Sequence, residues 1–261
     1  MDRPREPLPT VVDATPPLPP AYHDALDAGL RGLSVELPPG ALLAVEGHVR
    51  LLLAWTAAIN LTAIRDPAAI GTAHVLDSLA ALPWLTARTI PSLLDLGSGG
   101  GFPGVPLAAA LPDTDVALLE AVGKKARFLE ASLGATGLAP RVRVITARAE
   151  ALARVRDHRD AWSVVTARAV ASSAELVELA FPLLAPGGSL LAWKGSALDD
   201  ELAGARRAVA ALGGGRLDVI PEPARVPGLH GHVILVATRS VTGQVPDAYP
   251  RDPATRARRP W

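Results

Sequence analysis

The sequence predicts an α/β fold built on a parallel, doubly wound sheet of seven strands. From residue 91 onward, short apolar segments alternate with longer segments of helical apolar spacing, and this alternation is typical of strands joined by helices. The second observation is the stretch LLDLGSGGGFPG at residues 93–104, where a strand end, a glycine cluster and a helix-like run follow directly. A strand, glycine turn and helix together form a crevice for a nucleotide-sized ligand.

Four segments are expected along the chain. Residues 1–40 are an extension that we expect to be largely disordered, because its first 20 residues are rich in proline. Residues 41–90 form an N-terminal helical cap: 41–59 has helical apolar spacing, and a second helix begins at Asp66-Pro67, an acidic cap followed by a first-turn proline. The main domain spans 91–240, and a basic C-terminal tail spans 241–261.

Within the main domain the elements can be placed from the apolar pattern. Strands are predicted at 92–96, 116–119, 142–145, 163–167, 188–193, 216–220 and 232–237. Helices are predicted at 104–111, 123–136, 147–155, 172–184 and 198–212. No internal repeat is evident.

The composition excludes several classes of chemistry. The 261 residues are 49% hydrophobic and 20% charged, which is enough apolar material for one large domain. The chain has no cysteine, so disulfides, thiolate zinc sites, iron–sulfur clusters and cysteine nucleophiles are excluded. No metal-ligand spacing occurs among the six histidines. We find no signal-peptide core and no apolar run of about 20 residues, so a cytoplasmic protein is expected.

The glycine loop favours one nucleotide ligand over another. Gly99, Gly101 and Gly104 satisfy G-x-G-x-x-G, but this match alone is weak, because the frame starts beyond the strand end. Asp95 precedes Gly97 and Gly99, and an acid facing the crevice suits an ammonium group and repels a pyrophosphate. The loop therefore favours S-adenosyl-L-methionine (AdoMet) over a dinucleotide.

Two acidic positions at later strand ends fit an adenosine ligand. Glu120 ends the second strand, about 20 residues after the loop, where a carboxylate can accept both ribose hydroxyls. Ala149-Glu150 follows the third strand, where the adenine would lie. A solvated strand-end acid at Glu120 and a simple helix N-terminal acid at Glu150 are the structural alternatives.

Basic residues follow the next strands. Arg168 comes directly after the fourth strand, beside the expected methyl group, and suits a phosphate or a purine edge. Lys194 ends the fifth strand, and Lys124 and Lys125 open the helix after Glu120. These lysines are candidates for binding RNA phosphates, although a salt bridge for Lys194 and a solvated helix face for the other two are open alternatives.

His74 and Asp77 lie on one face of the second predicted helix, three residues apart. They could form a catalytic dyad, but a structural hydrogen-bonded pair is the favoured interpretation.

With these residues in view, the chain resembles the RsmG (GidB) family of bacterial 16S rRNA guanine-N7 methyltransferases from about residue 45 to its C-terminus. The matching motifs occur in order: Asn60-Leu61-Thr62, Arg65-Asp66-Pro67, His74-Val75-Leu76-Asp77-Ser78, DLGSGGGFPG, Gly123-Lys124-Lys125, Arg148-Ala149-Glu150, Arg168-Ala169, Lys194-Gly195 and Tyr249-Pro250-Arg251-Asp252-Pro253. Two departures are the longer proline-rich start and Ala254, where the closing motif tends to have glycine.

The resemblance implies a class I AdoMet-dependent methyltransferase fold, AdoMet as cofactor and a guanine of 16S rRNA as substrate. It implies that the partner is the 30S subunit or its assembly intermediate, and we expect a monomer that uses neither metal nor membrane. By position, the cofactor site would comprise Gly97, Gly99, Phe102, Glu120, Ala149, Glu150 and Arg168. Arg168 is the expected catalytic residue, and Lys124, Lys125 and Lys194 are the expected RNA contacts.

Guanine N7 carries a free lone pair, so direct in-line methyl transfer needs neither a general base nor a covalent intermediate. Three alternatives stay open from the sequence. The formal glycine motif also fits an NAD(P)-dependent oxidoreductase. A catalytically silent RNA-binding module, or a methyltransferase with a different RNA or small-molecule target, would keep the same fold.

Overall fold

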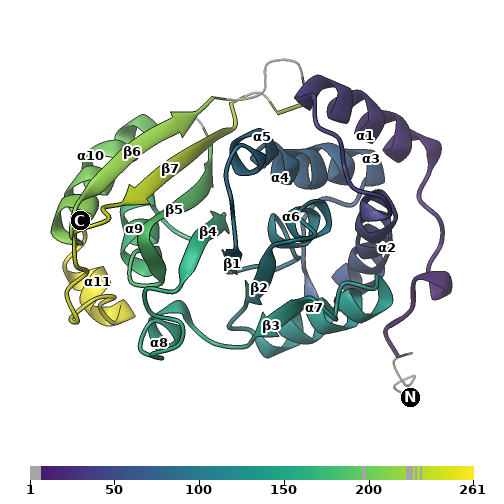
Figure 1. Ribbon diagram of the computed structural model, residues 1–261. Helices are drawn as coiled ribbons and strands as arrows, with labels where there is room; N and C mark the ends of the chain where they lie inside the picture. Colours follow the sequence, from purple (N-terminus) through teal and green to yellow (C-terminus); the bar gives the residue numbers. More distant parts are fainter. Residues whose placement is uncertain (1–6, 196–197, 222–225, 227, 230) are drawn as a thin grey trace.

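The computed structural model describes residues 7–195, 198–221, 226, 228–229 and 231–261. Its centre is a seven-stranded sheet in the order β3–β2–β1–β4–β5–β7–β6 (Figure 1), which confirms the predicted doubly wound α/β architecture. The strands are β1 (Ser92–Leu96), β2 (Asp115–Leu119), β3 (Val142–Ile145), β4 (Trp162–Arg168), β5 (Leu184–Lys194), β6 (Gly215–Ile220) and β7 (Val233–Arg239).

The sheet is mixed rather than fully parallel, and this corrects the prediction. Strands β1 to β5 pair in parallel, whereas β7 is antiparallel to both β5 and β6. The difference lies in the strand order: β7 is inserted between β5 and the edge strand β6, so the chain turns back from β6 and runs antiparallel to both of its neighbours. The sequence placed both strands but carried no signal for their direction.

Helices cover both faces of the sheet. They are α1 (Pro20–Leu33), α2 (Ala41–Ile59), α3 (Pro67–Ile70), α4 (Asp77–Leu79), α5 (Leu82–Thr86), α6 (Gly104–Ala110), α7 (Gly123–Ala135), α8 (Ala149–Leu152), α9 (Ser173–Ala180), α10 (Leu198–Ala211) and α11 (Pro253–Arg258). A 3₁₀ turn (Val12–Ala14) precedes α1, and a π-helical turn (Gly71–Leu76) joins α3 to α4. Helices α1 to α7 and α8 to α11 lie on opposite sides of the sheet (Figure 1).

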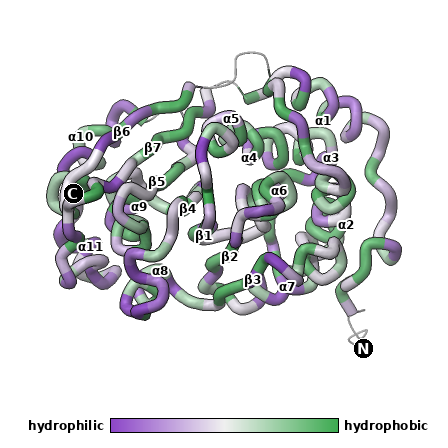
Figure 2. Tube along the Cα trace, viewed as in Figure 1, coloured by the Kyte–Doolittle hydropathy of each residue, from purple (hydrophilic) through white to green (hydrophobic). Residues whose placement is uncertain are grey.

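Alternation along the strands divides the apolar side chains between two cores. Leu93 of β1 belongs to the core beneath α2, α6 and α7, whereas Leu94 and Leu96 belong to the core beneath α8, α9 and α10. Successive side chains of a strand point to opposite faces, so Asp95 shares the α6 face with Leu93. Hydrophobic residues concentrate on the central strands and α6, and hydrophilic residues on α11 (Figure 2).

Part of the N-terminal segment that we expected to be largely disordered forms helix α1. Tyr22 is 1% exposed, and a Cβ added at Gly29 would lie 2.0 Å from a methyl group of Leu76. Arg50 of α2 donates hydrogen bonds to the carbonyls of Val12 and Pro16. Helix α1 thus packs against Leu76, and the segment before it is bound to α2; the proline content does not reveal these contacts with distant segments. The predicted start at Asp66 is confirmed, since its carboxylate accepts from the Ala69 amide at 2.8 Å.

Two N-terminal segments are apolar and long enough to span a bilayer by composition: α2 and the helical segment 67–86. The expectation that no such run exists is therefore corrected. About half of each segment is buried inside the protein, and Val45, Val49 and Leu52 of α2 lie in the core. Burial of this kind is characteristic of core helices.

Candidate functional site

Two cavities open at the carboxyl ends of the central parallel strands, where doubly wound sheets bind ligands. The large cavity, about 840 Å³, lies among the glycine loop, residues of the segment 61–77 and the ends of β4 and β5. The small cavity, about 220 Å³, lies among the ends of β1 and β2, helices α8 and α9, and Arg256 of α11. Gly97 and Ala171 line both cavities. The two cavities therefore adjoin at the glycine loop and are considered together as one candidate site.

The glycines of the loop have two separate roles. Gly97 and Gly99 line the cavities, whereas a Cβ at Gly101 would lie 2.6 Å from the His48 ring, and φ there is +91°. A Cβ at Gly104 would lie 2.4 Å from Leu118. The formal G-x-G-x-x-G match therefore ends in two glycines that serve packing, and of its three motif glycines only Gly99 borders the ligand space.

Asp95 does not line either cavity. Its side chain is fully buried, Oδ1 accepts from the Thr166 hydroxyl at 2.7 Å, and Oδ2 accepts from the Gly104 amide at 3.2 Å. Burial raises the pKa of this carboxyl to about 6, although its hydrogen bonds oppose the shift. The predicted contact between Asp95 and a ligand ammonium group is thus absent from the geometry. Asp95 instead fixes the start of α6 against the sheet, because strand alternation turns it toward that helix.

Glu120 holds the glycine loop in place. One carboxylate oxygen accepts from the Gly99 amide at 2.9 Å, and the other accepts from the Val122 amide at 2.7 Å. The side chain lines the small cavity, and the residue is 6% exposed. Glu120 is therefore a buried, hydrogen-bonded acid rather than a solvated one.

Ala149 and Glu150 begin α8 and line the small cavity. The Glu150 carboxylate accepts from Nη2 of Arg256 at 2.5 Å. Nε of the same guanidinium donates to Glu175 of α9 at 3.0 Å. Arg256 thus joins the two helices that border the small cavity.

Arg168 lies at the end of β4, in a polar cluster on the wall of the large cavity. Its Nη1 donates to the Asp77 carboxylate at 2.9 Å and to the Ala73 carbonyl at 3.0 Å, and its Nη2 lies 3.1 Å from His74 Nδ1. Asp77 also accepts from His232 Nδ1 at 3.0 Å, and its side chain is only 4% exposed. His74 and Asp77 are therefore joined through Arg168 rather than to each other.

The contact with Arg168 favours one tautomer of His74. A guanidinium can only donate, so we assign His74 Nδ1 as the acceptor from Arg168 and place the ring proton on Nε2, which then donates to the Thr62 hydroxyl at 2.7 Å. Burial, followed by the positive charge of Arg168, lowers the pKa of His74 to about 4. The ring lies against Phe102 in a tilted arrangement, with centroids 4.9 Å apart, and Phe102 also lies beneath Arg168. At neutral pH, His74 is a neutral wall of the large cavity.

The three lysines fall into different environments. Lys124 is exposed, and Lys125 lines the large cavity; neither forms an ion pair with a described residue. Lys194 also lines the cavity, but its side chain is 10% exposed, and its ammonium donates to Glu201 at 2.8 Å and to the Ala171 carbonyl at 2.9 Å. The salt bridge considered for Lys194 is present, and its RNA contact stays a prediction.

His48 of α2 supports the glycine loop from beneath. Its Nε2 donates to the Gly100 carbonyl at 2.9 Å, and its Nδ1 accepts from the Ser132 hydroxyl at 2.7 Å. The ring is fully buried, and burial lowers the pKa to about 4. The neutral ring satisfies both partners, because Gly100 offers an acceptor and Ser132 offers a hydroxyl proton.

We expect His48 to lower the free energy of unfolding in mild acid. Between about pH 6.5 and about 4 the unfolded chain binds a proton at this position and the folded chain does not. The free energy of unfolding therefore falls as pH falls through this window, by up to about 1.4 kcal/mol per pH unit. His74 acts in the same direction, and Asp95 in the opposite one, since its raised pKa removes stability as pH rises from 3.8 to about 6.

The measurement is urea unfolding at several pH values for the wild type and His48→Gln. Because Asp95 and His74 are common to both proteins, the difference between their curves isolates His48. The wild-type advantage should shrink as pH falls; a difference that is constant with pH would contradict the expectation.

Sequence reasoning missed three residues of the site: His48, His232 and Arg256. For the two histidines, no local signal distinguishes them from ordinary helix or loop residues. Arg256 could have been anticipated, because Asp252-Pro253 repeats the acid-then-proline helix start used for Asp66-Pro67. Asp252 does cap α11, accepting from the Thr255 amide at 2.9 Å.

Comparison with known proteins gives consistent matches. The chain matches the model of the GidB family, described as rRNA small subunit methyltransferase G, over residues 42–221. A relative named Ribosomal RNA small subunit methyltransferase G from Roseiflexus castenholzii is 47% identical over 210 residues, covering 80% of this chain and 87% of that protein. The protein of the same name from Symbiobacterium thermophilum is 38% identical over 244 residues, covering 92% and 98%. The crystal structure of P. horikoshii TYW2 in complex with MeSAdo aligns with a TM-score of 0.51 and 14% identity over 65% of this chain and 64% of that one, a likeness of fold.

Proposed function

This chain belongs to the GidB family of rRNA small subunit methyltransferase G proteins, and on that premise we propose that it methylates N7 of a guanine in 16S rRNA with AdoMet. The observation that carries the proposal is that the two cavities adjoin at the glycine loop, where both are lined by Gly97 and Ala171. Acids line the small cavity, and the Arg168 cluster lines the large one. A cofactor and a nucleobase would thus meet where the cavities join.

The residues present fit AdoMet. The adenosine would be held in the small cavity by Glu120, Ala149 and Glu150. The rest of the AdoMet molecule would be bordered by Gly97, Gly99 and Phe102. A Cβ at Gly97 would lie 2.8 Å from the Val170 side chain, so the loop has no room for a larger residue at the junction. When bound, AdoMet supplies a methyl group made electrophilic by its sulfonium sulfur.

The chain needs no general base for this reaction. Guanine N7 offers its lone pair at neutral pH, so the bond from N7 to the methyl carbon forms as the methyl–sulfur bond breaks, and no proton is removed. His74 is already satisfied on both ring nitrogens by Thr62 and Arg168. Its role is to form a neutral wall, and the gain in rate comes from in-line placement, worth up to about 7–11 kcal/mol in favourable cases.

Arg168 orients the substrate in this proposal. Three of its N–H groups are taken by Asp77, Ala73 and His74, and an arginine has five. The usual bidentate contact of arginine with guanine uses both O6 and N7. N7 must stay free here, so the remaining donors of Arg168 would contact O6 or a neighbouring phosphate.

Lys124 and Lys125 would bind RNA phosphates at the rim, with Lys194 as a further predicted contact. We expect the Lys124→Ala/Lys125→Ala variant to weaken RNA binding and to reduce the slope of log K against log salt by about 0.7 for each phosphate that is no longer neutralised. A filter-binding titration at several salt concentrations measures this slope. Arg206→Ala/Arg207→Ala on α10 removes the same charge outside both cavities and should keep the wild-type slope. An unchanged slope for the lysine variant would remove these lysines from the interface.

The direct test uses 30S subunits from a strain that lacks this gene. Tritiated methyl groups should be incorporated into their 16S rRNA, and cleavage at N7-methylguanine should map them to one nucleotide. Subunits from the parent strain should accept none. Incorporation into another RNA, or at another atom, would overturn the proposed target. Naked rRNA and assembly intermediates, assayed alongside, would identify the form that is recognised.

Calorimetry distinguishes the oxidoreductase alternative, because the methyltransferase should bind S-adenosylhomocysteine (AdoHcy) and not NAD. We propose that the protein acts in the cytoplasm, as a monomer and without a metal ion. No group of three potential metal ligands occurs in the described part of the chain.

A further inference from the structure

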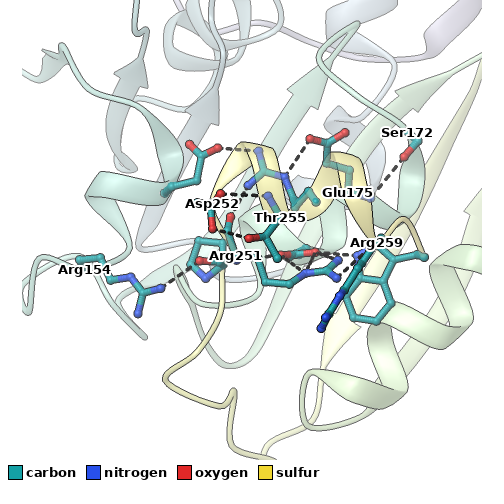
Figure 3. A network of polar contacts seen from close by, with 12 residues as sticks. Arg154, Ser172, Glu175, Arg251, Asp252, Thr255 and Arg259 are labelled. Carbon is teal, nitrogen blue, oxygen red and sulfur yellow. Dashed lines mark hydrogen bonds and ion pairs between the residues drawn. The ribbon is translucent and has the colours of Figure 1, made fainter.

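The C-terminal segment 245–261, expected to be a basic tail, is bound to the protein across α8 and α9. Arg154 donates to the carbonyls of Asp247 and Pro250, and Arg159 donates to that of Tyr249. Figure 3 shows Arg154 extending toward the part of the segment that holds Arg251 and Asp252. In each of these contacts an arginine side chain binds a backbone carbonyl, so the contacts fix the path of the main chain in this segment. The C-terminal segment is thus a built part of the domain rather than a free arm.

A buried ion pair anchors the segment at its centre. Glu178 of α9 is fully buried and accepts from the amide, Nε and Nη2 of Arg251 at 2.8, 3.0 and 2.6 Å. The indole of Trp261 donates to the same carboxylate at 2.7 Å. The Arg251 guanidinium also lies 4.7 Å from the centre of the Trp261 ring. Arg251 precedes α11 and Trp261 follows it, so Glu178 fixes the chain on both sides of this helix.

Anchored in this way, α11 directs one side chain into the wall of the small cavity. Arg256 is only 10% exposed and binds Glu150 at 2.5 Å and Glu175 at 3.0 Å. It also donates to the Arg251 carbonyl at 2.6 Å, so its own position is tied to the anchor. The bond to Glu150 uses Oε1, and no described residue donates a hydrogen bond to Oε2. Arg256 therefore fixes the Glu150 side chain and leaves one carboxylate oxygen for a ligand.

We propose that Arg256 is a positioning residue for the cofactor: it holds Glu150 in the orientation that receives the purine ring of AdoMet. The C-terminal segment is then a structural wall of the cofactor site, and bound cofactor and docked segment stabilise each other, since coupling between two binding events is reciprocal. The inference rests on the proposed function for the identity of the ligand.

The test is AdoHcy binding by calorimetry, with the full-length chain. Arg256→Gln should raise the Kd about tenfold, as expected for loss of a hydrogen bond to a charged group. Arg258→Gln is the matched control, because it removes the same charge from the same helix at an exposed position; its Kd should equal that of the wild type. Equal Kd values for Arg256→Gln and the control would overturn the proposal.

A double-mutant cycle tests whether Arg256 acts through Glu150. If it does, Arg256→Gln should add little to the effect of Glu150→Gln, whereas additive effects would overturn the positioning role. In methyl transfer, Arg256→Gln should raise the KM for AdoMet and leave kcat unchanged, and Arg256→Lys should recover part of the affinity. A fall in kcat at unchanged KM would also contradict the role.

The coupling between cofactor and segment has a separate readout. Saturating AdoHcy should increase the hydrogen-exchange protection of residues 245–261 in the wild type, and less so in Arg256→Gln. Failure of the proposed function would look different, because the wild type itself would then bind no AdoHcy.

Discussion

Replacing Arg168 with alanine should lower kcat for methyl transfer about a hundredfold or more, while the Kd for AdoHcy stays within a few-fold of the wild type. The first expectation follows from the proposed role of Arg168 in orienting the guanine, since a displacement of about 1 Å of a reacting group can lower the rate about a hundredfold. The second follows from the position of Arg168 among Asp77, His74 and Ala73, on the large-cavity side of the glycine loop. Single-turnover methylation of 30S subunits and calorimetry measure the two quantities.

The control addresses folding, because Arg168→Ala leaves Asp77 buried, and among the described residues only His232 then contacts its carboxylate. The stranded charge should cost stability, and adding Asp77→Asn should restore much of that stability without restoring activity. Wild-type turnover in Arg168→Ala would remove Arg168 from the mechanism. A collapse of AdoHcy affinity would instead assign it to cofactor binding.

Replacing Arg251 with alanine should destabilise the protein by about 3–5 kcal/mol, the usual cost of leaving a buried charge unpaired. Glu178 is fully buried, whereas the Arg251 side chain is 18% exposed, so the penalty arises on the glutamate. Urea unfolding at neutral pH measures the change. For residues on a free tail the change should be within about 0.5 kcal/mol, so the experiment separates a docked segment from a loose one.

A second variant shows that the charge is the cause. Glu178→Gln in the Arg251→Ala background removes the stranded charge while keeping the shape of the side chain, and it should recover part of the missing stability. No recovery would mean that the effect comes from the packing of the Arg251 side chain against Tyr249 and Trp261 rather than from its charge.

The main-domain elements could be predicted because their signals are local. Strand β1 was placed at its observed bounds, 92–96, and α2 at 41–59, since apolar spacing records which side of an element faces the core. The direction of β7 could not be predicted, because pairing partners are set by contacts between distant segments. Helix α1 was missed for the same reason: its apolar face is covered by the π-helical turn around Leu76.

The same distinction between local signals and distant contacts applies to the site residues. The sequence placed Gly97, Glu120, Glu150 and Arg168 at strand ends, and all four line one of the two cavities. It also assigned Asp95 to the ligand and described residues 241–261 only as a basic tail. The structure places Asp95 under α6 and the tail against Glu178.

By itself, then, the sequence determined the sheet-and-helix order, the glycine loop at its strand end and the family motifs that indicate a methyltransferase. Only the tertiary structure decided how the charges are paired: Arg168 with Asp77, Lys194 with Glu201, and Arg256 with Glu150. The reason is physical. Apolar periodicity depends on residues that are neighbours in the sequence. The partner of a buried charge depends instead on the fold, which brings distant segments together and excludes water between them.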